Sequence, residues 1–146
     1  MNIEIDINAP LSSAKEIHIE APLENVWTLL TDIEKWTDWQ PDITSAKLEG
    51  PLVAASVFRW KAKGLSIVST LHTVEPQHEI GWSGVSPGMF AIHNWTMETA
   101  ENGTRVVTKE SLTGWFARLL KIVDPHFLDK SLETILLRLK AQIENL

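Results

Sequence analysis

Hydrophobic and polar positions near the end of the chain follow a helical period. Between Pro125 and Leu146 the apolar residues recur at intervals of three and four, and charged residues occupy the other side. The apolar positions are Leu128, Leu132, Ile135, Leu136, Leu139, Ile143 and Leu146. A helix of this length spans roughly 30 Å, about the diameter of a small domain. We therefore expect one amphipathic helix from Pro125 to Asn145, whose apolar stripe requires an equally long partner.

The residues in front of this helix predict a break. Proline inside a helix costs about 3 kcal/mol, whereas at the first helical position it is well tolerated. Asp124 is therefore expected to cap the C-terminal helix, with Pro125 as its first residue. Gly114 to Val123 then forms a separate helical piece.

Short β-type runs separated by turn residues occupy the middle of the chain. The strongest turn signal is Asn102-Gly103, because both residues tolerate a positive φ. The pattern predicts strands near residues 43–49, 56–62, 66–74, 79–85, 91–99 and 104–112. An earlier run from Lys15 to Glu20 brings the antiparallel sheet to seven strands.

Further elements are expected near the start of the chain. Residues 3–7 alternate between isoleucine and acidic side chains, which predicts an extra edge strand within residues 1–14, in the same chain or against a second one. Pro22 suits the first position of a helix that continues over residues 23–33. A shorter helix follows at 34–40 and must end at the next residue, which is proline.

The two-residue period of a strand assigns its side chains to faces. Charged Arg59 and Lys61 are expected to face water, which turns Phe58 and Trp60 toward the core. In the next strand two inner rows fit the pattern, and the row of residues 67, 69 and 71 is favoured. The same reasoning predicts inward positions for Ile80, Trp82, His93, Trp95, Met97, Val106, Thr108 and Glu110.

The composition narrows the class of protein. With 146 residues the chain has the length of a single domain that needs no disulfides or metals. Cysteine is absent and the histidines lack ligand spacing, so neither a metal site nor a cofactor is expected. A net charge of -6 without a basic cluster argues against a nucleic-acid partner. We expect a cytoplasmic protein, because neither a secretory signal nor a run of ~20 apolar residues is found.

The order of the predicted elements, together with several short sequence stretches, matches that of a known family. The stretches are residues 19–27, 30–41, 50–51, 56–61, 80–82 and 103–111. The chain resembles the helix-grip fold of the START-like superfamily, also called SRPBCC, and is most similar to its polyketide cyclase/dehydrase and lipid-transport family. The resemblance implies one α+β domain over residues 1–146, in which a seven-stranded antiparallel sheet curls around the C-terminal helix. Members of this family include aromatase/cyclases and lipid carriers, so the fold alone does not determine the activity.

Tryptophan is the most unusual feature of the composition, with seven residues in a chain that has no tyrosine. Trp60, Trp82 and Trp95 are expected on the inner face of a curved sheet, where three indoles are hard to pack solidly. An incompletely filled interior is a ligand pocket. Trp36 and Trp39 share one face of the short second helix. They either line a ligand entrance or pack between helix and sheet, and large apolar residues at helical spacing usually pack.

His93 and Glu110 form the polar pair of the predicted inner face. The Asn102-Gly103 hairpin makes their strands neighbours and places His93 opposite Glu110 or the residue before it. Such a pair in an apolar cavity suits general acid/base chemistry. The alternative is a buried hydrogen-bonded pair without a catalytic role. Ser69 and Thr108 are expected to form local hydrogen bonds and to orient a ligand, because no third group supports a catalytic triad.

Two functions from different classes fit these residues. The first is a binding protein that encloses a small hydrophobic or aromatic ligand between the sheet and the C-terminal helix. The second is an enzyme of cyclase/dehydratase type that uses His93 and Glu110 for proton transfer. A third interpretation, an adaptor that contacts another protein, rests on the expected N-terminal edge strand alone. A sugar, nucleotide or phosphate is disfavoured, because the chain has no glycine-rich loop and no converging basic residues.

Overall fold

The computed structural model describes residues 2–145. Within that range seven strands form one antiparallel sheet in the order β1-β7-β6-β5-β4-β3-β2. The strands are β1 (Leu11–Ile19), β2 (Ile43–Glu49), β3 (Val57–Ala62), β4 (Leu65–Glu75), β5 (Glu79–Ser86), β6 (Met89–Ala100) and β7 (Gly103–Thr113). The helices are α1 (Leu23–Thr31), η1 (Ile33–Lys35), α2 (Trp36–Trp39), α3 (Trp115–Val123) and α4 (Phe127–Glu144). The expected α+β fold is confirmed.

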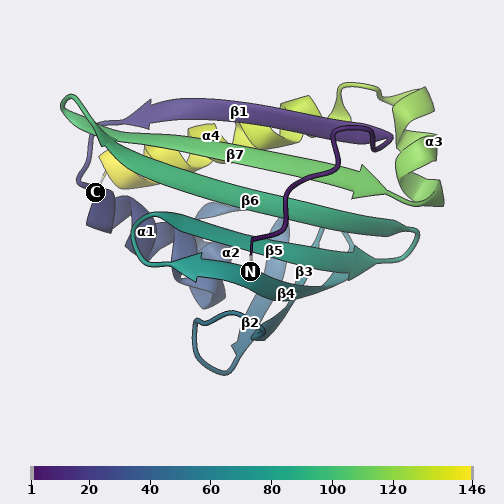
Figure 1. Cartoon of the computed structure of the whole chain (residues 1–146), viewed down its shortest axis with the longest axis horizontal. Coiled ribbons are helices and arrows are strands. Elements are labelled where there is room, and N and C mark those ends of the chain that lie inside the picture. The colour runs from purple at the N-terminus through teal and green to yellow at the C-terminus, as the bar shows by residue number, and fades with distance from the viewer. Residues whose placement is uncertain (1, 146) are drawn as a thin grey trace.

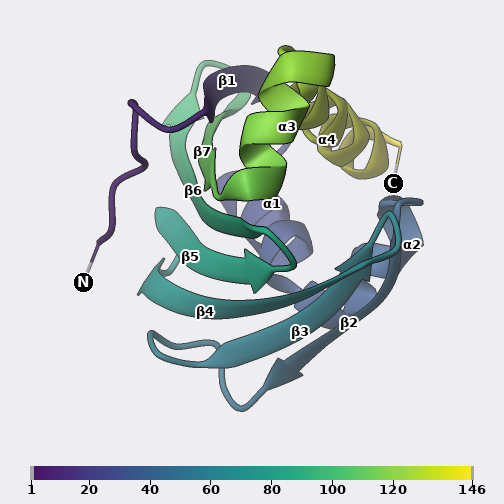
Figure 2. The same ribbon diagram turned by 90° about the vertical axis from the view of Figure 1, so that its right-hand side faces the viewer.

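The sheet curls around α4, which lies on its concave side together with α1 and α2 (Figures 1 and 2). Helix α3 stands at the other end of the sheet from α1 (Figure 1). The apolar stripe predicted for the last helix faces the sheet, and Leu132, Leu136 and Leu139 are almost fully buried. Phe58 and Trp95 on the sheet are also fully buried, and they belong to the main hydrophobic core that the helices and the sheet share. None of the described helices is long and apolar enough to cross a membrane.

The break before α4 is confirmed, but the expected cap is wrong. Helix α4 begins at Phe127, two residues later than predicted, and its N-terminal flanking residue is His126. Pro125 lies in the turn between the helices, where the Phe127 N–H donates to the Asp124 carbonyl over 3.0 Å. The Asp124 carboxylate accepts a hydrogen bond from Lys130 at 3.0 Å instead of from the helix N-terminus.

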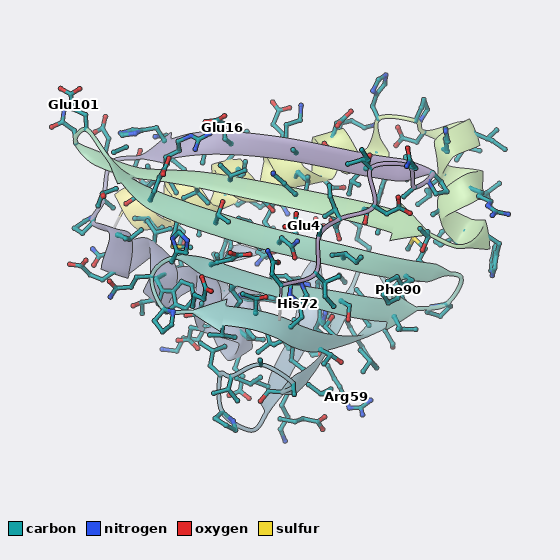
Figure 3. The ribbon with its side chains drawn as sticks, viewed as in Figure 1. Glu4, Glu16, Arg59, His72, Phe90 and Glu101 are labelled. Atoms are coloured by element: carbon teal, nitrogen blue, oxygen red, sulfur yellow. The ribbon has the colours of Figure 1, made fainter. Side chains whose placement is uncertain are left out.

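The N-terminal segment does not form the expected edge strand within this chain, and its pairing with a second chain stays a prediction. Residues 2–10 have no strand structure and cross the outer face of the sheet (Figure 1), while β1 begins at Leu11. The Ile3 N–H donates to His72 Nδ1 at 3.3 Å, and the Asn94 side chain donates to the Ile3 carbonyl at 2.7 Å. Side chains of the sheet therefore hold the segment, and His72 lies on this outer face (Figure 3).

An irregularity in strand β4 explains why its pattern is hard to assign from sequence. The pairing of β4 with β5 shifts between Leu71 and Thr73. Leu71 and Ser69 are buried on the inner side, which confirms the favoured inner row. After the shift Val74 also packs against the main core, so the two-residue period changes phase at His72.

Candidate functional site

A cavity of about 550 Å³ lies between the concave face of the sheet and α4. Its apolar wall comes from strands β3 to β7 and from one side of α4. The residues include Trp60, Ile67, Trp82, Ala91, Leu112, Leu132 and Ile135. The size lies within the range of small-molecule sites, which are typically apolar with a few placed polar groups.

One row of side chains across the sheet forms the polar part of this wall. In register, Trp82 of β5 is opposite His93 of β6, and His93 is opposite Glu110 of β7. Both His93 and Glu110 line the cavity, and their side chains are only 8% and 17% exposed. His93 Nδ1 lies 3.6 Å from Glu110 Oε2. The hairpin that joins β6 and β7 creates this pairing, because its turn fixes the register of the two strands.

The residues around His93 hold its ring in one orientation and disfavour its protonated, charged form. The ring packs against Trp82 and Trp95, with centroids 5.1 and 5.2 Å away. His93 Nε2 and the Thr108 hydroxyl are 2.7 Å apart. Burial among these rings lowers the pKa of His93 to about 3, because the imidazolium loses its hydration there. His93 is therefore neutral at physiological pH.

Glu110 is shifted in the opposite direction by the same cause. Burial raises the pKa of its carboxyl to about 8, since the carboxylate is the form that loses hydration. At neutral pH the side chain is therefore a protonated acid that can donate a hydrogen bond. If His93 Nε2–H donates to Thr108, its Nδ1 lone pair points to Glu110, and the two groups form a neutral donor and acceptor pair.

A second polar contact lies farther along the sheet. The Trp60 Nε1–H donates to the Ser69 hydroxyl over 3.0 Å, and both residues line the cavity. Gly84 lies on the adjacent strand, where an added Cβ would come within 2.9 Å of the Ser69 oxygen. A residue without a side chain at position 84 therefore leaves space for the Trp60–Ser69 pair.

Charged residues form the rim of the cavity, and the sequence analysis did not single them out. Arg138 of α4 pairs with Asp42 at 2.9 Å, and this hydrogen bond holds the pKa of Asp42 below its usual range. Lys63 of the β3–β4 hairpin lies over the ring of Phe127, 5.1 Å from its centroid. Lys130 pairs with Asp124. In the sequence, the only indication of this rim is the four-residue spacing of positions 130, 134 and 138, which places these side chains in one row beside the apolar stripe of α4.

The predicted site residues fall into two groups. Trp60, Ser69, Trp82, His93 and Glu110 line the cavity. The other four are not among the lining residues. Trp36 and Trp39 are buried in the main core. Trp95 is also buried there, and its ring stacks on the ring of His93. Thr108 is linked to the cavity only through its hydrogen bond with His93.

Trp36 illustrates why the helical tryptophans pack rather than line the cavity. Its indole N–H donates to the Leu30 carbonyl at 2.9 Å, so its polar edge is satisfied within the helical region. Its ring contacts Phe58, Trp60 and Trp82, each at a centroid distance of 5.5 Å. This aromatic cluster supports the wall of the cavity from behind.

The curled sheet and the helix that it encloses define a START-like fold. The chain belongs to the polyketide cyclase / dehydrase and lipid transport family, whose sequence profile matches residues 10–144. This family membership supports a role in binding hydrophobic ligands. No curated protein matches the chain in sequence.

Solved structures from three bacteria share the fold. A hypothetical protein from Helicobacter pylori superposes with a TM-score of 0.84 at 17% identity, covering 97% of both chains. The ZhuI aromatase/cyclase from Streptomyces sp. R1128 has a TM-score of 0.78 at 14% identity, covering 92% of this chain and 93% of its own. A START superfamily protein from Mycobacterium smegmatis has a TM-score of 0.73 at 12% identity, with coverages of 92% and 97%. At these identities the likeness establishes the fold alone.

Proposed function

We propose that this protein binds a small hydrophobic or aromatic molecule in the cavity between the sheet and α4. The observation that carries the proposal is a cavity of about 550 Å³ whose wall is mostly apolar and contains one buried polar pair, His93 and Glu110. Apolar walls supply most of the affinity of such sites, and isolated polar groups fix the orientation of the ligand.

The polar pair suits an uncharged polar group on the ligand. Protonated Glu110 donates a hydrogen bond, which a carbonyl or hydroxyl oxygen accepts. An anion placed beside Glu110 would lack a cationic partner, because the basic lining residues Lys63, Lys130 and Arg138 belong to the rim. A flat or aliphatic molecule with a carbonyl or hydroxyl at one end therefore fits best.

The size of the apolar contact sets the expected affinity. Burial of ~200 Å² of apolar ligand surface contributes roughly 5 kcal/mol before association costs. Hydrophobic compounds that are not the natural ligand should therefore bind with dissociation constants on the order of micromolar at best.

Titration with hydrophobic aromatics and fatty acids, followed by tryptophan fluorescence, tests the proposal. We expect a saturable change that Trp82→Ala weakens, because Trp82 lines the cavity. Trp115→Phe is the matched control, since Trp115 is 68% exposed and does not line the cavity. Circular dichroism should verify that both variants are folded. A broad panel without any saturable change would contradict the proposal.

The His93–Glu110 pair also favours a second candidate, an enzyme of cyclase/dehydratase type. A neutral base and a protonated acid lie 3.6 Å apart on the wall of one cavity, and their pKa values are shifted apart by burial. Opposite shifts of this kind are typical of acid/base assignments in active sites. In this role Glu110 donates a proton to the substrate and His93 accepts one.

A further inference from the structure

Helix α3 presents an apolar face to solvent. Trp115, Leu119, Ile122 and Val123 are 68%, 47%, 79% and 67% exposed. Spacings of four and three place Trp115, Leu119 and Ile122 on one side of the helix. The opposite side is occupied, because Ala117 is fully buried in the smaller of the two core clusters. The exposed face is therefore a second apolar surface that the fold leaves uncovered.

Helix α3 is held firmly against the turn between β5 and β6. The Phe116 N–H donates to the Gly88 carbonyl over 3.0 Å. Gly114 has a φ of 107°, and a side chain there would collide with the Gly88 carbonyl, so only glycine fits this position. Backbone contacts thus fix the side of α3 that packs against the β5–β6 turn. The outer side faces solvent, since no other element within residues 2–145 covers it.

The charged residues within α3 are basic, although the chain as a whole is acidic. Arg118 and Lys121 are the only charged residues of α3, although the whole chain has a net charge of -6. At 100° per residue they follow each other on one flank of the apolar face. A helix with an apolar face, an exposed tryptophan and flanking basic residues is typical of segments that lie in the interface of an anionic membrane.

The position of α3 connects this face to the cavity. Val123 is the last residue of the helix, and the next residue, Asp124, already lines the cavity. Ser86 and Met89, at the two ends of the β5–β6 turn, line it as well. Figure 2 shows α3 at the near end of the curled sheet, beside β1, β7 and α4. Phe90, 44% exposed, lies at the same end of the outer face (Figure 3).

We propose that α3 docks the protein on an anionic phospholipid surface. The apolar face inserts among the acyl chains while Arg118 and Lys121 contact the headgroups. The cavity then opens beside the membrane, which gives a hydrophobic ligand a path between bilayer and protein; this last step rests on the proposed ligand binding. A second protein copy fits less well, because a helix about 14 Å long covers far less than the ~1,200 Å² of a stable interface.

Sedimentation with vesicles of phosphatidylcholine alone or mixed with phosphatidylglycerol tests the docking. We expect binding to the mixed vesicles only, weakened by salt. Leu119→Ser should lower the partition coefficient about tenfold through lost apolar burial. Arg118→Gln should lower it about fivefold through lost attraction to the headgroups. Leu137→Ser is the matched control, since Leu137 is a comparably exposed leucine (53%) on α4.

Each contrary outcome overturns the docking proposal. Equal binding to both kinds of vesicle would reject the role of the basic flank. Equal losses in Leu119→Ser and Leu137→Ser would reject the role of α3. No vesicle binding, together with a dimer that Leu119→Ser dissociates, would assign the face to self-association. Fluorescence titration of Leu119→Ser with the aromatic panel separates the two proposals, because ligand binding should stay unchanged if only docking depends on α3.

Discussion

His93 on β6 lies directly opposite Glu110 on β7, and their facing atoms Nδ1 and Oε2 are 3.6 Å apart. Burial moves the pKa of the acid up to about 8 and that of the base down to about 3. Both side chains are consequently neutral between those values. Neither side chain therefore carries a charge before it exchanges a proton with a ligand. The shifted pKa values also make the free energy of unfolding depend on pH.

Glu110 is expected to make the protein less stable as the pH rises from 6.5 toward 8. The unfolded chain loses this proton near the ordinary pKa of 4.5, whereas the folded protein keeps it up to about 8. The unfolded state thus binds fewer protons in this interval, so the free energy of unfolding falls as the pH rises. His93 opposes this trend only below its ordinary pKa of 6.5. Above that value Glu110 is the only member of the pair that contributes.

Urea unfolding of the wild type and of Glu110→Gln at several pH values measures this effect. Between pH 6.5 and 8 the wild type should lose roughly 1.5 kcal/mol more than the variant. The slope of about 1.36 kcal/mol per pH unit falls to half as the folded carboxyl reaches its pKa of about 8. The glutamine is the matched control, because it keeps the size of the side chain and does not titrate. An identical pH dependence of both proteins would show that Glu110 does not fold in its protonated form.

The same substitution separates an enzyme from a binding protein. If the cavity is catalytic, Glu110→Gln should abolish turnover, because the amide cannot deliver a proton. Ligand affinity should stay within about tenfold, a change below ~1.4 kcal/mol, since the apolar wall is intact. The comparison requires a turnover assay and a fluorescence titration on the same preparation. Equal turnover in both proteins would reject the catalytic role of Glu110.

A larger residue on the cavity wall should reduce ligand binding with little effect on folding. Ala91 is only partly buried and lines the cavity, so Ala91→Leu fills empty space there. We expect the affinity for bulky aromatics to fall about tenfold or more, because the added side chain occupies the volume of the ligand. Ala117→Leu is the matched control, since Ala117 is fully buried in packed core. It should instead cost about 1–3 kcal/mol of stability.

Calorimetry and ligand titration of both alanine variants check this expectation. A loss of stability in Ala91→Leu as large as that in Ala117→Leu would mean that the wall around Ala91 is already packed. Unchanged affinity in Ala91→Leu would mean that the ligand lies elsewhere.

The sheet and the polar pair could be predicted because local signals determine them. The Asn102-Gly103 turn sets the register of β6 and β7, and that register alone brings His93 opposite Glu110. The apolar stripe of α4 likewise requires no knowledge of its partner. Inward positions followed from the two-residue period wherever charged residues marked the outer face, as Arg59 does on β3.

Features that depend on distant parts of the chain could not be predicted in the same way. The rim pair of Asp42 and Arg138 joins residues 96 positions apart, and neither residue has a distinctive neighbourhood in sequence. The strand predicted to begin at Lys15 begins at Leu11, because the backbones of Ser12 and Ser13 also pair with Ser111 and Glu110 across the sheet. Alternation at the N-terminus indicates an extended segment without saying whether a strand or side chains will hold it.

The N-terminal segment is expected to stabilise the sheet through Ile3. Its backbone N–H and carbonyl form hydrogen bonds with His72 and Asn94, both of which are buried on the outer face. Removal of residues 1–8 should lower the free energy of unfolding by about 1–3 kcal/mol, since each such bond contributes about 0.5–1.5 kcal/mol. Ile7→Ser is the matched control and should have almost no effect, because Ile7 is 76% exposed. Urea unfolding and hydrogen exchange of the Ile3 amide measure the contribution. Rapid exchange at Ile3, or equal stability of the shortened and full-length chains, would show that the segment does not hold the sheet.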